Sequence, residues 1–241
     1  MNIFLKMAFL FFIGSLLGWG IEVVYRRFFS KENKEKKWIN PGFLVGPYLP
    51  LYGFGLCTLY LLARIDRFLP MGLWWGKLLL FVGMAVCMTA LEFVAGLIFI
   101  RHMKVKLWDY TNEKGNIMGI ICPKFSLFWA LLGAVYYFLV HPHILGALHW
   151  LAQNLAFSFV LGFFYGVLTI DLVYSFRLVA KVRAFAKENE LIVRYEALRQ
   201  YVRERREEQK KRVHFLLSLR SEVPLPELLR EYAEHLKNIR K

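Results

Sequence analysis

The sequence predicts an all-α membrane protein, with a five-helix transmembrane bundle over residues 1–178 and a basic cytosolic helical tail over residues 179–241. Two observations predict this class. Several apolar runs exceed eighteen residues, and 57% of the 241 residues are hydrophobic although the formal net charge is +14. Such a run can cross roughly 30 Å of hydrocarbon at about 1.5 Å per residue. Only a helix satisfies its own backbone hydrogen bonds in that environment, so each run is expected to be helical.

The apolar runs define five expected spans, which cover residues 3–25, 47–63, 74–100, 121–140 and 152–176. The first run resembles a signal peptide in its position. However, it continues to Val24 without a small-residue cleavage site and then meets Arg26 and Arg27. We therefore expect a retained first helix.

The positions of lysine and arginine predict the orientation. The first connection carries six of these residues, the third carries five and the part of the chain from Arg177 onward carries seventeen, which together make up 28 of the 32 in the chain. Cytosolic connections are enriched in Lys and Arg. We therefore expect a multi-pass membrane protein, with the N-terminus outside and the C-terminus in the cytosol.

The tail is expected to form two helices, the first continuing from span five to about Leu219 and the second starting near Glu227. Pro224 and Pro226 separate them, because proline cannot continue a helix interior. From Arg177 onward the chain contains seventeen basic residues and ten acidic ones. This balance favours a solvated helix near anionic lipid headgroups, or one that recruits a protein partner. No nucleic acid is expected, because no basic motif is interleaved with aromatic residues.

Three carboxylates lie inside apolar spans, namely Glu22, Glu92 and Asp171. Intramembrane acids are costly and are typical of functional sites. The basic residue that follows each acid in the sequence marks the cytosolic boundary. Measured along the helix from that residue, Glu22, Glu92 and Asp171 lie roughly 6, 14 and 9 Å inside the boundary. We expect them to converge on one acidic cavity near the cytosolic side. The structural alternative is that they form ion pairs with Arg26, Lys124 or Arg177 and hold the bundle together.

Two connections on the same side add further candidates. Residues 40–53 contain three prolines and three glycines, which predicts a shaped loop entering the bilayer rather than a slack linker. The third connection is rich in aromatic and polar residues, which either anchor the interface or cover the cavity. The expected ligand-binding residues are Glu22, Tyr25, Arg26, Tyr48, Tyr52, Glu92, Trp108, Asp109, Tyr110, Asn116, Lys124 and Asp171.

These residues also carry a resemblance. Five features carry it, namely Glu22, the string G-F-L-x-G-P-Y-x-P-x-Y-G at 42–53, Glu92, W-D-Y at 108–110 and N-x-x-G-x-I-C at 116–122. Together they resemble the putative ABC-transporter type IV (CmpB-like) family of bacterial membrane proteins. The resemblance covers about residues 8–176 and excludes the tail. It implies a role in transport and a location in the bacterial inner (cell) membrane. The family pattern has arginine where this chain has Pro41 and Ile120. If those arginines bind an anion, Lys124 or Arg26 is expected to do so here.

Three functions remain open at this point. The first is a transporter or transporter subunit that binds a polar solute or lipid headgroup. The second is an intramembrane enzyme acting on a lipid-linked substrate, with Glu22, Glu92 and Asp109 as acid–base or metal-binding groups. The third is a non-catalytic scaffold. The sequence leaves the cofactor unknown. No residue is assigned as a metal ligand, because the outer histidines His141, His143 and His149 lack a zinc-site pattern. The sequence contains no nucleotide-binding G-x-x-x-x-G-K-[ST] loop.

Overall fold

The computed structural model describes residues 2–30, 33, 35–65, 74–188, 192–195 and 197–204. The chain divides into two compact units. Residues 1–95 and 110–175 form the first unit, and residues 96–109 and 176–241 form the second. Each unit is described by itself below.

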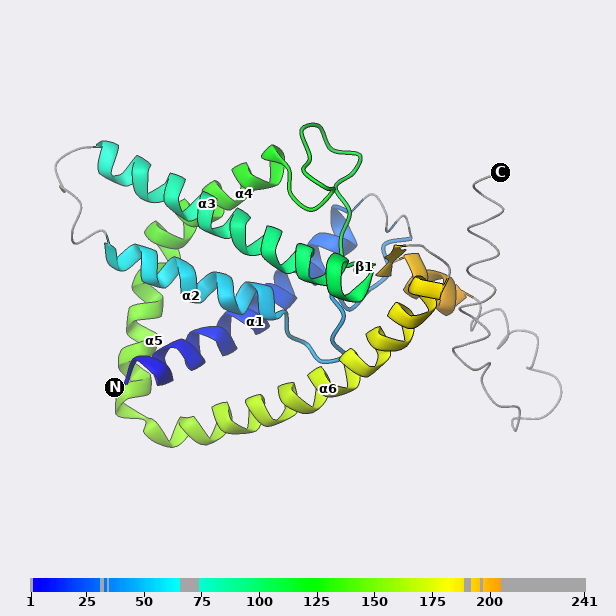
Figure 1. Cartoon of the computed structure of the whole chain (residues 1–241). Helices are drawn as coiled ribbons and strands as arrows, with labels where there is room; N and C mark the ends of the chain where they lie inside the picture. Colours follow the sequence, from blue (N-terminus) through cyan, green and yellow to red (C-terminus); the bar gives the residue numbers. More distant parts are fainter. Residues whose placement is uncertain are drawn as a thin grey trace. The chain divides into compact units, whose positions relative to one another are not determined.

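Six α-helices account for most of the described chain (Figure 1). Their bounds are α1 Ile3–Phe28, α2 Pro50–Ile65, α3 Trp74–Ile98, α4 Pro123–Val135, α5 His141–Gln153 and α6 Ser158–Glu188. Short turns of π-helix at Phe99–Met103 and Tyr136–Val140 extend α3 and join α4 to α5, and a 3₁₀ turn at Leu155–Phe157 precedes α6. The two strands are β1 Val105–Lys106 and β2 Val193–Arg194.

Four described helical segments are long and apolar enough to cross a membrane, which are Ile3–Phe28, Trp75–Met103, Pro123–Gln153 and Leu155–Glu188. The expectation of a mostly helical membrane protein is therefore supported. Helix α2 is apolar but has only 16 residues. At about 1.5 Å per residue it is shorter than the hydrocarbon core. The count of five spans and the cytosolic position of the tail remain predictions.

The helical segment Pro123–Gln153, which corresponds to expected span four, is longer than predicted. We predicted that span four ends at residue 140, but helical backbone continues through α5 to Gln153. Pro142 would disturb a regular α-helix at this point. The π-helical turn immediately before it changes the hydrogen-bond spacing, and the His141 N–H bonds to the Tyr136 carbonyl, five residues back. This local rearrangement lets the helix continue past the proline.

Helices α1 and α2 pack very closely. A Cβ atom at Gly14 would lie 2.8 Å from both the Leu56 Cβ and the Tyr52 carbonyl oxygen. The Leu49 N–H also donates to the Ser15 carbonyl at 2.9 Å, which ties the start of α2 to the middle of α1. Small residues allow this approach, since membrane helices associate mainly through van der Waals packing.

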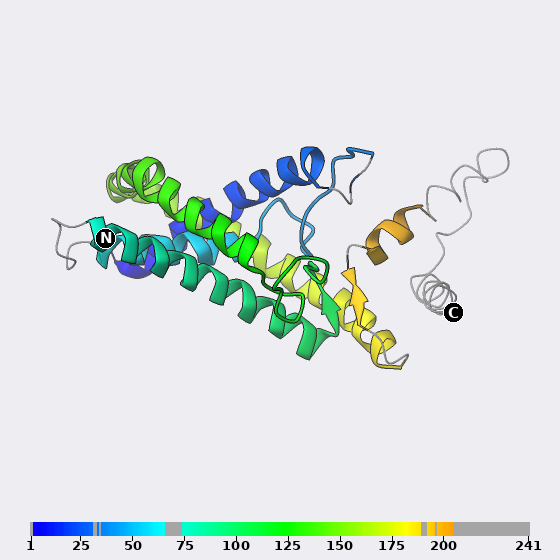
Figure 2. The ribbon, with the colours of Figure 1, turned by 90° about the horizontal axis from the view of Figure 1, so that it is seen from above.

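The other helices of the first unit complete a common core. Figure 2 shows α3 and α4 side by side, and the Thr89 hydroxyl donates to Ser126 between them at 3.0 Å. On α6, the Tyr165 hydroxyl donates to the Ala8 carbonyl of α1 at 2.9 Å. Leu10, Met84 and other buried side chains from the helices of this unit form one hydrophobic cluster.

The outward faces of these helices are strongly apolar. Phe159, Leu127 and Ile170 are 81%, 72% and 72% exposed, and many other large hydrophobic side chains are also exposed. A soluble monomer rarely shows so much exposed apolar surface. Contact with lipid tails explains it, which agrees with a membrane protein.

The second unit contains a short parallel pairing of β1 with β2, in which Val105 is opposite Val193. Both valines are 0% exposed. We predicted that a continuous helix runs from span five to about Leu219, and this was wrong, because α6 ends at Glu188 and β2 follows. At Val193–Arg194 the backbone pairs with β1 of the same unit, so it does not form the hydrogen bonds of a continuing helix. The predicted proline break and second tail helix lie outside the described residues.

Candidate functional site

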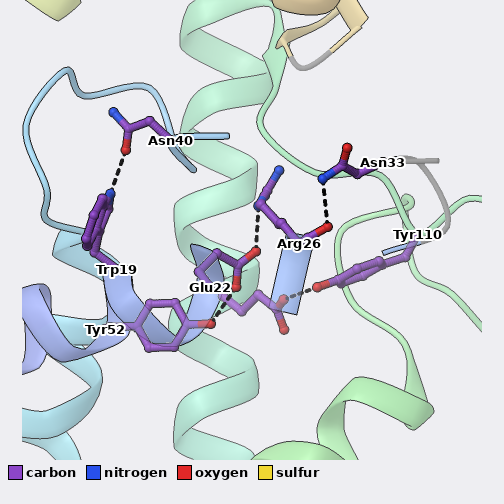
Figure 3. Close-up of polar contacts among 8 residues, drawn as sticks. Trp19, Glu22, Arg26, Asn33, Asn40, Tyr52 and Tyr110 are labelled. Atoms are coloured by element: carbon purple, nitrogen blue, oxygen red, sulfur yellow. Dashed lines mark hydrogen bonds and ion pairs between the residues drawn. The ribbon is translucent and has the colours of Figure 1, made fainter. Parts of the chain in front are cut away.

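The first polar network is centred on Glu22 of α1 (Figure 3). The Arg26 Nε donates to one carboxylate oxygen at 2.9 Å, and the Tyr52 hydroxyl of α2 donates to the other at 2.9 Å. Glu22 and Arg26 are one helical turn apart, so their side chains meet on the same face. Their side chains are 20% and 19% exposed. Glu22 is thus a partly buried carboxylate whose charge is balanced by an arginine.

The second network is centred on Glu92 of α3. The Tyr110 hydroxyl donates to one carboxylate oxygen at 2.9 Å, and the Trp129 Nε1 of α4 donates to the other at 3.0 Å. Glu92 is only 4% exposed. Both of these donors are neutral, and no ion pair of Glu92 is found within the described residues. Glu92 is therefore oriented by hydrogen bonds without being neutralised by a cation.

The two networks adjoin each other. The rings of Tyr52 and Trp129, which hold Glu22 and Glu92 respectively, lie 6.1 Å apart between centroids. Burial raises the pKa of the Tyr110 phenol above its ordinary range, and the carboxylates of Glu92 and Glu22 raise it further. Tyr110 therefore remains protonated and stays a donor at neutral pH. We call Glu22, Arg26, Tyr52, Glu92, Tyr110 and Trp129 the Glu22–Glu92 cluster.

Trp129 is the member of this cluster that the sequence analysis missed. Its position in an apolar span made it look like an ordinary packing residue. The available signal was its indole N–H, which needs an acceptor when buried. Nothing in the local sequence identifies Glu92, 37 residues away, as that acceptor.

The third connection is folded so that Tyr110 reaches the cluster. Asn116 donates to the carbonyls of Thr111 and Glu113 and accepts from the Gly119 N–H. The Tyr110 N–H bonds to the Gly119 carbonyl at 2.8 Å, and its ring stacks on Phe125 at 4.3 Å between centroids. Asn116 thus shapes the loop, and the loop fixes the position of the phenol.

Asp171 of α6 belongs to a different network. Its carboxylate accepts hydrogen bonds from the backbone N–H groups of Val45 and Gly46, at 3.1 and 2.8 Å, and from the Tyr48 hydroxyl at 2.6 Å. Ser175 adds a fourth donor at 2.8 Å. A Cβ at Gly46 would lie 2.3 Å from the Tyr48 ring, so glycine allows this close arrangement. Asp171 and Tyr48 therefore hold the 42–48 segment against α6.

The remaining expected site residues have other surroundings. Tyr25 is 43% exposed and stacks on Phe29. Lys124 is exposed and pairs with Glu113 at 2.9 Å. In the second unit, Asp109 pairs with Lys106 at 3.2 Å and with Arg194 of β2 at 2.9 Å, while Trp108 is half-buried beside it. The structure thus brings Glu22, Arg26, Tyr52, Glu92 and Tyr110 together. Whether any of the expected residues binds a ligand remains a prediction.

The chemistry of the cluster is that of an acid–base and hydrogen-bonding site. Two carboxylates and one guanidinium leave it with a formal charge of −1 when both acids are ionised. Within the described part of the chain, no group of three or more His, Cys, Asp or Glu residues could hold a metal ion. The cluster therefore offers acceptors for a proton or for the cationic group of a ligand.

Comparison with known proteins places this site within a family. The model of the family described as "Putative ABC-transporter type IV" matches residues 9–176. The chain belongs to this family. The match spans all twelve expected site residues and the whole Glu22–Glu92 cluster, whereas the tail lies beyond it. No match was found among curated proteins or among solved structures. The family description supports the expected relation to transport, and it names no solute.

Proposed function

We propose that this protein is a transport-type membrane protein that binds the cationic group of a polar solute or lipid headgroup at the Glu22–Glu92 cluster. The observation that carries the proposal is the state of Glu92. Glu92 is 4% exposed, and its carboxylate accepts only from a phenol and an indole among the described residues. An ionised carboxylate without a cation is expensive inside a protein and inside a membrane.

The charge of the cluster decides the class of ligand. Arg26 already neutralises Glu22, at 2.9 Å, so Glu92 is the carboxylate that has no counter-charge among the described residues. An ammonium group or a proton would supply it, whereas an anion would add to the repulsion. The cluster therefore favours cationic groups over the anionic headgroup that the tail is expected to meet.

The arrangement also suits reversible binding. A salt bridge to a resident lysine or arginine would keep Glu92 permanently neutralised. Tyr110 and Trp129 instead fix its orientation and leave its charge available. A carboxylate that alternates between a bound proton and a bound cation is a common device in transporters. The neutral donors around Glu92 therefore favour the hypothesis of a transport site over that of a static ion pair.

Binding of a cationic probe by purified variants tests this proposal. In Glu92→Gln the shape is retained, and the amide oxygen can still accept one of the two hydrogen bonds. We expect choline and simple alkylammonium salts to raise the unfolding temperature of the full chain. That increase should disappear in Glu92→Gln, with sodium chloride at equal ionic strength as the reference.

Glu113→Gln is the matched control. Glu113 is also an acid, but it pairs with the exposed cation of Lys124 and lies outside the cluster. This variant should respond to the cations like the unmodified chain. If Glu92→Gln keeps the full response, or if the unmodified chain shows none beyond that of sodium chloride, the proposal is wrong. Native mass spectrometry of the purified chain would then identify any solute that co-purifies.

A further inference from the structure

A second polar site lies near the end of the first unit that is remote from the Glu22–Glu92 cluster. A cavity of about 310 Å³ is lined by Lys6, Tyr60, Ala63, Arg64, His141 and Leu145. Lys6 precedes Glu22 by 16 residues on α1, which is about 24 Å along a helix. The cavity is therefore separate from the site discussed above.

The polar groups of this cavity are cationic or hydrogen-bond donors. Lys6 and Arg64 carry fixed positive charges, and within the described residues neither has an acidic partner. Two like charges lining one cavity repel each other, and an anion between them would remove that repulsion. The side chains thus create a positive field with nothing in the described chain to balance it.

Tyr60 and His141 add donors of defined orientation. Tyr60 is only 4% exposed, and it lines the cavity. A phenol hydroxyl can both donate and accept, so Tyr60 can contribute a hydrogen bond to a ligand in the cavity. The His141 Nδ1 lies 2.9 Å from the Tyr136 hydroxyl. This contact fixes the orientation of the imidazole at the wall of the cavity.

We infer that this cavity binds a phosphate group, carried either by a small soluble phosphate ester or by a phospholipid headgroup. Arginine presents a planar set of donors that matches phosphate oxygens, and lysine adds a second full charge. Two fixed cations fit the charge of a phosphate better than that of a single carboxylate. The volume is at the lower end of the range for small-molecule sites, which leaves room for a small organic substituent.

The inference does not depend on the proposed function, and its experiment uses different residues and probes. Inorganic phosphate and glycerol 3-phosphate are titrated into the purified full chain, and binding is measured calorimetrically. We expect Arg64→Gln and Lys6→Gln each to weaken binding by about tenfold or more, the scale of one charge-assisted contact to phosphate. Lys77→Gln is the matched control. It removes one positive charge near the start of α3, where Lys77 lies over the Phe138 ring and does not line the cavity.

A second arm distinguishes the two sources of phosphate. Native mass spectrometry records retention of phosphatidylglycerol by the same variants, with and without glycerol 3-phosphate as competitor. Retention that is lost in Arg64→Gln but kept in Lys77→Gln assigns the site to a lipid headgroup. Titratable binding of the soluble esters without lipid retention assigns it to a free ester.

Two outcomes would overturn the inference. One is that the unmodified chain binds neither the phosphates nor the lipid. The other is that Arg64→Gln, Lys6→Gln and Lys77→Gln all weaken binding equally, which would indicate only non-specific attraction by net charge. Gel-filtration profiles and helical circular dichroism confirm that each variant is folded, so loss of binding cannot be assigned to loss of structure.

Discussion

At the scale of single residues, the carboxylates of Asp171 and Glu92 are stabilised in different ways. Asp171 accepts from two backbone N–H groups, a phenol and a serine hydroxyl, which together can stabilise a full negative charge. Glu92 has two donors on neutral side chains. The first pattern is typical of a structural anchor, and the second is typical of a group that can exchange its counter-charge.

The anchor role of Asp171 can be measured directly. In Asp171→Ala the N–H groups of Val45 and Gly46 and the Tyr48 hydroxyl lose their acceptor. Because hydrogen bonds to charged groups contribute about 1.5–3 kcal/mol each and are not additive, we expect a loss of about 2–5 kcal/mol in the free energy of unfolding. Unfolding by denaturing detergent measures the loss, and limited proteolysis within residues 40–49 should become faster.

Asp171→Asn serves as the intermediate variant, since it retains an acceptor oxygen but not the charge. Its destabilisation should be smaller than that of Asp171→Ala. A response of Asp171→Ala to cationic probes like that of Glu92→Gln, with unchanged stability, would instead place Asp171 in the ligand site.

At the scale of elements, the contact between α1 and α2 depends on the absence of side chains. Gly14, Ser15 and Gly18 on α1 face Gly53 and its neighbours on α2. A Cβ at Gly53 would lie 2.3 Å from the Ser15 Oγ and 2.8 Å from the Phe11 carbonyl oxygen. Because Glu22 and Tyr52 are carried by these two helices, their separation also sets the geometry of the Glu22–Glu92 cluster.

Gly14→Ala tests this helix contact. The added methyl group would meet the Leu56 Cβ and the Tyr52 carbonyl at 2.8 Å, and neither atom is the end of a flexible chain. Overpacking of this kind typically costs about 1–3 kcal/mol, so we expect a lower unfolding temperature. Gly20→Ala is the control on the same helix, because a Cβ there would have nothing within 4 Å. Equal stability of the two variants would show that the close contact is not needed.

At the scale of the whole molecule, the orientation in the membrane is still a prediction from charge. The basic residues concentrate in the first connection, the third connection and the tail. Four described segments have membrane length, and α2 is shorter. If α2 does not cross the bilayer, the connections on either side of it would face the same compartment, and the alternation of basic and non-basic connections would break.

Reporter fusions and labelling decide between these topologies. A fluorescent reporter fused after Lys241 should be active, and an alkaline phosphatase fused there should be inactive, because the tail is expected in the cytosol. A cysteine at residue 145, which is exposed on α5, should react with a membrane-impermeant reagent added outside cells. Cys57, Cys87 and Cys122 are free cysteines, so they have to be replaced before the new cysteine is introduced for labelling. An active phosphatase at the C-terminus would reverse the predicted orientation.

The sequence by itself determined the helical membrane class, the apolar segments and most members of the Glu22–Glu92 cluster. These properties are local: the hydropathy of a run of residues, and the cost of an acid such as Glu92 in an apolar segment, do not depend on distant parts of the chain. Only the tertiary structure decided which groups pair. Asp171 bonds to Val45, 126 residues away, and not to the other two acids. The rotation of each helix and the path of each connection determine such pairs. The same reason explains Trp129 and the strand at Val193–Arg194, whose partners lie far from them in the sequence.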